Sequence, residues 1–113
     1  MKLNNSSKQM TVVNRLEVAD SFISRAVGLL GRKGLEESHG LWIHRCRDIH
    51  SWFMRFTFDA VFVDAKLNVL AVHPNLKPWR FVMEFKADSV FELPAGCIQK
   101  SQIEVGDQLD VVT

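Results

Sequence analysis

The segment from His50 to Asp64 contains the residues whose types and spacing best fit a binding or catalytic site. Arg55 and Asp59 are four residues apart, so they share one face of an extended strand. The side chain of His50 would lie on the other face of a straight strand, and it reaches the face of Arg55 and Asp59 only if the strand bends. Arginine donates two parallel hydrogen bonds to a carboxylate or phosphate, so this face suggests a pocket for a small anionic ligand. The alternative is a structural Arg–Asp pair that satisfies backbone groups at the end of a barrel.

Glu92 is a further candidate because it stands before a Leu-Pro pair, where the proline ends a strand ladder. Its carboxylate could accept hydrogen bonds from Arg25 or Arg80 and so lock a helix or loop to the sheet. With His50 and Asp59 it would instead supply the acid–base groups of a hydrolytic or metal-assisted enzyme. The sequence leaves both roles open.

Basic and aromatic residues are interleaved along the chain, and this pattern can bind single-stranded nucleic acid by stacking and phosphate contact. The members of this pattern that we assign to a binding surface, together with Asp59, are Arg55, Trp79 and Arg80. The chain has 14 basic and 13 acidic residues, so no overall field favours nucleic acid. We therefore expect a small ligand or a protein as the partner. The full set is Arg45, Arg47, Arg55, Lys77 and Arg80 with Trp42, Trp52 and Trp79.

Histidine and cysteine are the residues that would ligate zinc, and four of them lie close in sequence: His39, His44, Cys46 and His50. Their spacing matches none of the recognised metal motifs, and no orienting third group is evident for a Cys–His nucleophile. We predict no metal and no cofactor. The two cysteines, Cys46 and Cys97, are expected to be reduced residues of the core.

Length and composition place limits on the organisation of the chain. A chain of 113 residues fits one domain, which we place at residues 10–113 after a disordered lead-in at residues 1–9. The first ten residues are polar and lack the apolar core of a signal peptide. No apolar run reaches the ~18 residues of a membrane span. These features favour a soluble cytoplasmic protein.

The hydrophobic pattern predicts many short strands. From Trp52 to Phe62 the even positions are apolar almost without a break, which indicates a strand with one core face and one more polar face. Asp64 to Asn68 reads as a hairpin loop in which Asn68 takes the left-handed conformation. A helix is expected at 22–30, and one or two helical turns at 97–103. The expected strands are 10–18, 40–44, 49–56, 59–64, 68–73, 79–85, 89–93 and 108–112.

These elements favour a mainly β fold, namely a small antiparallel sandwich or barrel with one covering helix. Residues 49–56 and 59–64 are either one continuous strand or two strands bent near Thr57. The helix at 22–30 would cover one open end or one face of the sheets.

Several spaced motifs occur in an order that resembles the bacterial and archaeal family called domain of unknown function 192. The resemblance runs from about Val12 to the C-terminus and departs from the family pattern at Leu30, Thr57 and Asn68. The matching residues are Arg25, Gly28-Leu29, Gly31-Arg32, Gly40-Leu41, Met54-Arg55, Asp59, Val61-Phe62-Val63-Asp64, Pro78-Trp79-Arg80, Glu92-Leu93-Pro94-Ala95-Gly96 and Gly106-Asp107.

The resemblance implies a compact β domain of jelly-roll-like topology and no established activity. Many relatives are exported or lipid-anchored, and some are encoded near pilus or secretion machinery, which would fit an accessory protein of an envelope assembly. Among the matching residues we assign structural polar roles to Arg25, Asp64 and Asp107. Our leading hypothesis is a non-catalytic binding domain, and the alternatives are the enzyme and the envelope accessory.

Overall fold

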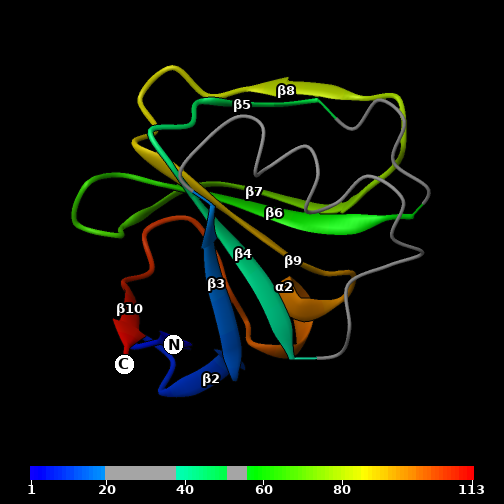
Figure 1. Ribbon diagram of the computed structural model, residues 1–113. Helices are drawn as coiled ribbons and strands as arrows, with labels where there is room; N and C mark the ends of the chain where they lie inside the picture. The colour runs from blue at the N-terminus through cyan, green and yellow to red at the C-terminus, as the bar shows by residue number, and fades with distance from the viewer. Residues whose placement is uncertain (20–37, 51–55) are drawn as a thin grey trace.

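The computed structural model describes residues 1–19, 38–50 and 56–113, and the described strands form three sheets (Figure 1). The central sheet has the order β3-β4-β9-β6-β7, the second has the order β10-β1-β2, and the third is the β5-β8 ribbon. The elements are β1 (Lys2–Asn5), β2 (Met10–Val13), β3 (Arg15–Ala19), β4 (His39–His44), β5 (Asp48–His50), β6 (Phe58–Val63), β7 (Val69–Leu76), β8 (Phe81–Met83), β9 (Ser89–Pro94), α2 (Cys97–Lys100) and β10 (Leu109–Val112).

The central strand β6 separates two hydrophobic cores. Its six side chains are all buried, so the prediction of one apolar and one polar face is wrong. Val61 and Val63 pack in a core with Leu3 of β1, whereas Phe58 and Phe62 pack in a second core that includes Ile49 of β5. A strand buried on both faces reads as a nearly continuous apolar run. The three-stranded sheet therefore covers one face of the central sheet and the β5-β8 ribbon covers the other.

The N-terminal residues contribute to the first core. β1 pairs with both β10 and β2, and Leu3 is fully buried, so the expectation of a disordered lead-in at residues 1–9 is wrong for this strand. The strand expected at 10–18 is divided at Asn14 into β2 and β3, which belong to different sheets. β3 pairs with β4 in parallel, so the predicted antiparallel arrangement is wrong for this pair.

Of the two alternatives for residues 49–64, the structure has two separate strands, because β5 and β6 belong to different sheets. The strands expected at 40–44, 89–93 and 108–112 are also confirmed, within a residue at each end. The strand expected at 68–73 extends to Leu76, and the one expected at 79–85 is limited to Phe81–Met83. The short helix expected at 97–103 is α2.

The hairpin between β6 and β7 forms as predicted, but with a different left-handed residue. Leu67 has a φ of 65°, and Asn68 instead makes an isolated bridge to Gln108. The Asp64 carboxylate fixes this turn, because Oδ1 accepts the backbone N–H groups of Lys66 and Asn68, both at 2.9 Å. The hydrogen bond from the Asn68 backbone is the main reason that the pKa of Asp64 lies below its usual value. These contacts are those of a residue that fixes a turn, which is the kind of role that we predict for Asp64.

The described strands build a sandwich rather than a closed barrel, because β3 and β7 lie at opposite edges of the central sheet. The mainly β fold class is confirmed. The helix expected at 22–30 lies outside the described residues, as does Arg25. Thus α2 is the helix found in the described part of the chain.

Candidate functional site

Asp59 and Glu92 lie on opposite faces of the central sheet. Asp59 is opposite Leu93 in the ladder between β6 and β9, and Glu92 is opposite Ala60. Residues directly opposite each other in a ladder point to the same face, and neighbours along a strand alternate. Both carboxylates are buried, at 0% and 4% exposure respectively. They cannot act on one substrate, so the enzyme hypothesis loses its pair of carboxylates.

Asp59 has a structural function in the fold. Its Oδ1 accepts the backbone N–H of Asn75 in β7, and its Oδ2 accepts the backbone N–H of Ile98 in α2, both at 2.8 Å. The second bond satisfies one of the N–H groups that have no partner within a helix at its first turn. Asp59 thus holds α2 and β7 to the central strand, and it offers no exposed carboxylate to a ligand.

Cys97 begins α2, and its thiol is buried. Burial, with a further contribution from the Asp59 charge, raises the pKa of the Cys97 thiol to about 11. Its Sγ donates to the backbone oxygen of Val12 at 3.4 Å. The thiolate is the nucleophilic form of cysteine. Cys97 is buried in the first core, as expected, and forms no disulfide in the structure.

The histidines and the other cysteine lie in separate surroundings. Cys46 is buried and its Sγ donates to the backbone oxygen of Asp48 at 2.9 Å. His39 Nε2 lies 2.9 Å from Glu17 Oε1 across the β3-β4 pair. Within residues 1–19, 38–50 and 56–113, no three His, Cys, Asp or Glu side chains converge as a metal site would require.

His50 and Arg55 cannot be joined to Asp59 in one described site. The backbone of His50 lies in β5, opposite Phe81 of β8, and therefore in the ribbon rather than in the central sheet. Arg55 lies outside the described residues. The pocket predicted from the shared face of Arg55 and Asp59 required one straight strand, and β6 begins only at Phe58.

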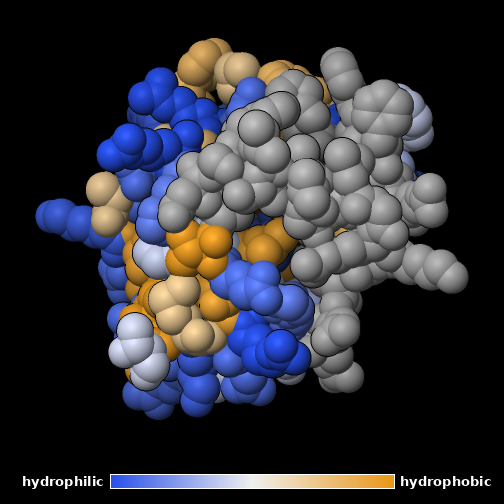
Figure 2. All heavy atoms as spheres, viewed as in Figure 1, coloured by the Kyte–Doolittle hydropathy of each residue, from blue (hydrophilic) through white to orange (hydrophobic). Residues whose placement is uncertain are grey.

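Trp79 belongs to an exposed apolar surface that we call the β8 face, and Arg80 follows Trp79 in sequence. The β8 face consists of Trp79, Phe81, Met83 and Phe85, whose exposed fractions are 60%, 48%, 42% and 77%. Val82 packs against the second core, so Phe81 and Met83 point to the opposite, outer side of β8. Trp79 and Phe85 lie in the turns before and after the strand. Figure 2 shows apolar atoms along the upper edge of the molecule, where Figure 1 draws β8 and the following turn.

Exposed basic residues surround one end of the β8 face. Lys86 follows Phe85 directly, and the backbone oxygen of Arg47 accepts the N–H of Glu84 at 2.7 Å. Arg45 precedes Cys46, whose N–H donates to the backbone oxygen of Asp88 at 3.1 Å. These bonds place the backbone of the segment 45–47 beside the turn that carries Phe85, and the exposed basic residues of the two segments are Arg45, Arg47 and Lys86.

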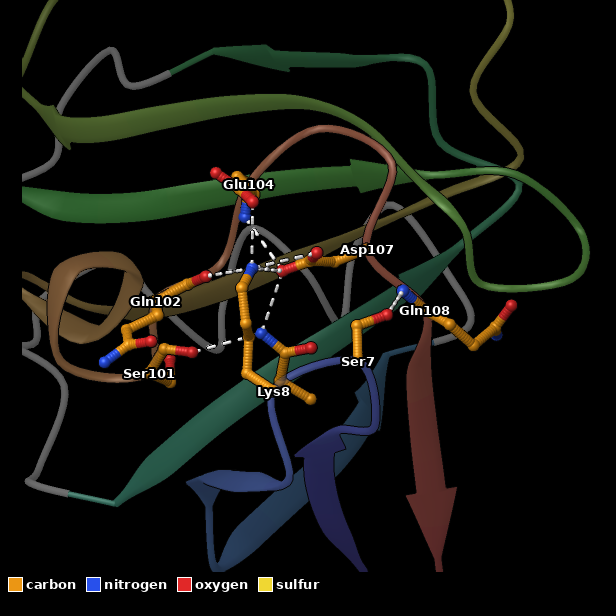
Figure 3. Close-up of polar contacts among 8 residues, drawn as sticks. Ser7, Lys8, Ser101, Gln102, Glu104, Asp107 and Gln108 are labelled. Atoms are coloured by element: carbon orange, nitrogen blue, oxygen red, sulfur yellow. Dashed lines mark hydrogen bonds and ion pairs between the residues drawn. The ribbon is translucent and has the colours of Figure 1, made fainter.

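A polar cluster ties the N-terminal hairpin to the segment before β10 (Figure 3). Lys8 Nζ lies 2.8 Å from Asp107 Oδ2 and 3.1 Å from Glu104 Oε1, and it also donates to the backbone oxygen of Gln102. The fully buried Asn5 donates to the same Asp107 oxygen at 3.0 Å. Asp107 thus links segments that are distant in sequence, and its partners Lys8 and Asn5 lie in the segment that was expected to be a disordered lead-in.

The pKa values of the Lys8–Asp107 pair move in the directions that favour an ion pair. The hydrogen bond to Asp107 raises the pKa of Lys8. Burial acts to raise the pKa of Asp107, but the hydrogen bonds from Lys8, Asn5 and the Glu104 N–H outweigh it, and the net shift is downward. The pair is therefore charged over the whole neutral range and contributes structure rather than acid–base chemistry.

A hollow of about 380 Å³ lies in the β1-β2 hairpin, away from the predicted ligand-binding residues. Asp59, Trp79 and Glu92 are not part of its lining. The residues that line it are Asn4, Asn5, Ser6, Gln9, Met10 and Thr11.

The sequence contained a signal for the β8 face that strand assignment alone did not use. Large apolar residues occur at every second position from Trp79 to Phe85, and Arg80, Val82 and Glu84 stand between them. This alternation predicts one apolar side, but only packing shows that the side with the larger residues faces outward. For Lys8 and Asn5 the local sequence is polar throughout and contains no comparable signal.

Comparison with known proteins shows the family. The model of DUF192, described as "Uncharacterized ACR", matches residues 2–111. The chain belongs to the DUF192 family. The family match predicted from the motifs is thereby confirmed.

Relatives of this DUF192 protein include UPF0127 proteins of Pyrococcus species. The one from Pyrococcus abyssi is 33% identical over 113 residues, covering 96% of each chain. The one from Pyrococcus furiosus is 37% identical over 102 residues, covering 85% of this chain and 87% of the relative.

Two solved structures are similar to this DUF192 protein in fold. One is a proposed transcription regulator from Sinorhizobium meliloti, with a TM-score of 0.81 and 21% identity, covering 96% of this chain and 89% of that one. The other is a protein of unknown function from Novosphingobium aromaticivorans, with a TM-score of 0.81 and 20% identity, covering 97% and 82%. At these identities the likeness establishes the fold alone. In the described ranges, no helix is long and apolar enough to cross a membrane.

Proposed function

We propose that this DUF192 protein is a non-catalytic binding module that presents the β8 face to a macromolecular partner. The observation that carries the proposal is the exposure of four large apolar side chains in one short segment, with Phe85 exposed by 77%. Single exposed apolar residues are normal on proteins, whereas contiguous ones mark binding surfaces. Aromatic residues and methionine are also enriched at interfaces.

The shape of the β8 face favours a partner with an extended binding surface over a small ligand. Its residues extend from the turn at Trp79, through the outer side of β8, to the turn at Phe85. A small ligand is usually held in a concave site that buries most of its surface. The side chains of the β8 face instead project from a two-stranded ribbon at the edge of the fold. Such a ribbon can be covered by a flat or extended partner surface.

The cytoplasmic location and the envelope assembly both remain predictions. The proposal is compatible with each, since an exposed apolar face could be covered in the cytoplasm or within an assembly. The residues that we retain from the sequence-based site are Trp79 and Arg80. Asp59 is reassigned to the architecture of the sheet, because both of its carboxylate oxygens accept backbone N–H groups.

Site-specific photocrosslinking in cells tests the proposal. A photoreactive phenylalanine analogue replaces Phe85 in one variant and Val105 in a control, because Val105 is exposed by 63% in a turn remote in sequence from β8. We expect an adduct of increased mass from position 85 that is absent or much weaker at position 105. Equal yields at the two positions, or no adduct at position 85, would reject the β8 face as a binding surface.

A further inference from the structure

We infer that the partner of the β8 face is a negatively charged lipid surface, which the protein binds peripherally through Phe85 and the exposed basic residues around it. This inference rests on the proposed function and specifies its partner. It combines two independent features of the structure, namely exposed apolar side chains and neighbouring positive charge.

The apolar residues are of the kinds that enter a membrane interface. Tryptophan and phenylalanine insert their rings at the level of the lipid headgroups and upper acyl chains. Trp79, Phe81 and Phe85 are aromatic, and methionine at position 83 is flexible enough to fit a fluid surface. Phe85 is the most exposed of the four and lies in the turn between β8 and β9. A turn with an exposed aromatic tip can enter a headgroup layer without unpairing the strands beside it.

Positive charge gathers at the same turn. Lys86 is adjacent to Phe85, and the hydrogen bonds described above place the backbone of the segment 45–47, which carries Arg45 and Arg47, beside the segment 84–88. Basic residues close to an anionic leaflet are each attracted by its negative surface potential. Arg80 and Lys77 add two exposed cations at the other end of β8.

Acidic residues near the β8 face offset only part of the positive charge of these basic residues. Glu84 lies between Met83 and Phe85 in sequence, but its Oε1 is 3.0 Å from His73 Nε2 of β7, on the inner side of the ribbon. Asp48 is opposite Met83 and shares the outer side, and Asp88 is exposed in the turn. The segments 45–48 and 77–88 thus contain five basic residues and three exposed or half-exposed carboxylates, of which the Glu84 carboxylate lies 3.0 Å from His73. The balance favours a negatively charged partner.

The same charges argue against a second copy of the chain as the partner. Two β8 faces that packed together would bring the basic residues of both copies close to one another, and like charges across an interface are unfavourable. A lipid surface containing phosphatidylglycerol has the opposite charge and also accepts apolar side chains. It thus complements both features of the β8 face at once.

Vesicle co-sedimentation of the full chain tests the inference. The probes are vesicles of phosphatidylcholine alone and vesicles of phosphatidylcholine mixed with phosphatidylglycerol. The variants are Phe85→Ser, the double variant Arg47→Gln with Lys86→Gln, and Val105→Ser as the matched control for an exposed apolar residue. Circular dichroism and a thermal melt confirm that each variant is folded.

We expect binding to the mixed vesicles that weakens as salt is raised, and little binding to phosphatidylcholine alone. Phe85→Ser should weaken binding by about tenfold, because a buried phenylalanine side chain contributes about that factor. The double charge variant should weaken the preference for phosphatidylglycerol by roughly thirtyfold, because it removes two of the five basic residues. Val105→Ser should bind as the wild type does.

The results separate the two proposals. If neither vesicle binds while Phe85 crosslinks to a protein in cells, the lipid inference is wrong and the binding module stands. A crosslink at position 85 to a second copy of the chain would likewise refute the lipid inference and leave the binding module standing. If vesicles bind equally to all variants, the β8 face is not the contact and the inference fails. If position 85 also gives no specific crosslink, both proposals fail.

Discussion

Replacing Asp59 should destabilise the fold strongly, because this residue is buried structure rather than an exposed functional group. The Asp59 carboxylate is fully buried and accepts two backbone N–H groups at 2.8 Å, one from Asn75 and one from Ile98. In Asp59→Asn the side chain keeps its size, but its amide nitrogen faces one of the two donors. In Asp59→Ala both donors lose their partner.

The two bonds are not equal in value. Hydrogen bonds to charged groups contribute about 1.5–3 kcal/mol each, and a buried donor left unpaired bears its full desolvation cost. Asn75 is exposed, so water can reach its N–H once the carboxylate is gone. Ile98 is buried at 7% exposure, so its N–H remains dry. We therefore expect a loss of about 3 kcal/mol in Asp59→Ala and about 2 kcal/mol in Asp59→Asn.

Urea unfolding at pH 7, followed by far-ultraviolet circular dichroism, measures this loss. With a slope of about 1.5 kcal/mol per M, the midpoint of Asp59→Ala should fall by about 2 M. Asp110→Asn is the control, since Asp110 is exposed on β10 and should change stability by less than about 0.5 kcal/mol. If Asp59→Asn and Asp110→Asn unfold at the same midpoint, the structural role that we assign to Asp59 is wrong.

Cys97 supplies an independent readout of the same carboxylate. Burial is the main reason that the pKa of this thiol is about 11, and the Asp59 charge adds to it. In Asp59→Asn the charge is lost, so the pKa of Cys97 should move down toward the ordinary value of 9.0. The rate of iodoacetamide alkylation as a function of pH measures it. An unchanged profile would show that the Asp59 charge does not act on the thiol.

Three further outcomes follow from the described contacts. Since hydrogen bonds, chiefly from Lys8, lower the pKa of Asp107 against the effect of burial, the folded state is stabilised above the unfolded pKa of about 4. That contribution is lost as the pH falls through the lower pKa that Asp107 has in the folded state. The midpoint of urea unfolding should therefore drop more steeply below pH 4 in the wild type than in Asp107→Asn. Parallel plots of midpoint against pH for the two proteins would contradict this. Gly40→Ala would place a Cβ 3.0 Å from Leu93 Cδ2, so we expect a cost of about 1–2 kcal/mol and a thermal midpoint lower by about 5–10 °C. An unchanged midpoint would mean that Leu93 moves aside freely. Native Cys97 should resist alkylation at pH 7 and react only after unfolding, as mass spectrometry would show; rapid labelling of the folded chain would exclude the buried, high-pKa thiol.

Local sequence determined those features that depend on neighbours along the chain. The alternation from Phe58 to Phe62 predicted a core strand, because side chains of a strand alternate between its faces. The Asp64 turn followed from a carboxylate beside backbone N–H groups a few residues on, which is a contact of short range. The family motifs were recognised in the same way, since their order is a property of the sequence. The mainly β class and the family are both confirmed.

Tertiary structure decided the role of each polar residue, because that role depends on partners distant in sequence. The break between β5 and β6 removed Asp59 from the predicted ligand pocket and placed it against Asn75 and Ile98. Lys8 became a structural residue only because its partner, Asp107, lies 99 residues further along the chain. The outward orientation of the β8 face was likewise decided by Val82, which packs into the core and leaves its larger neighbours outside. Burial on one side of a strand is a property of what packs against it, and the strand itself does not contain that information.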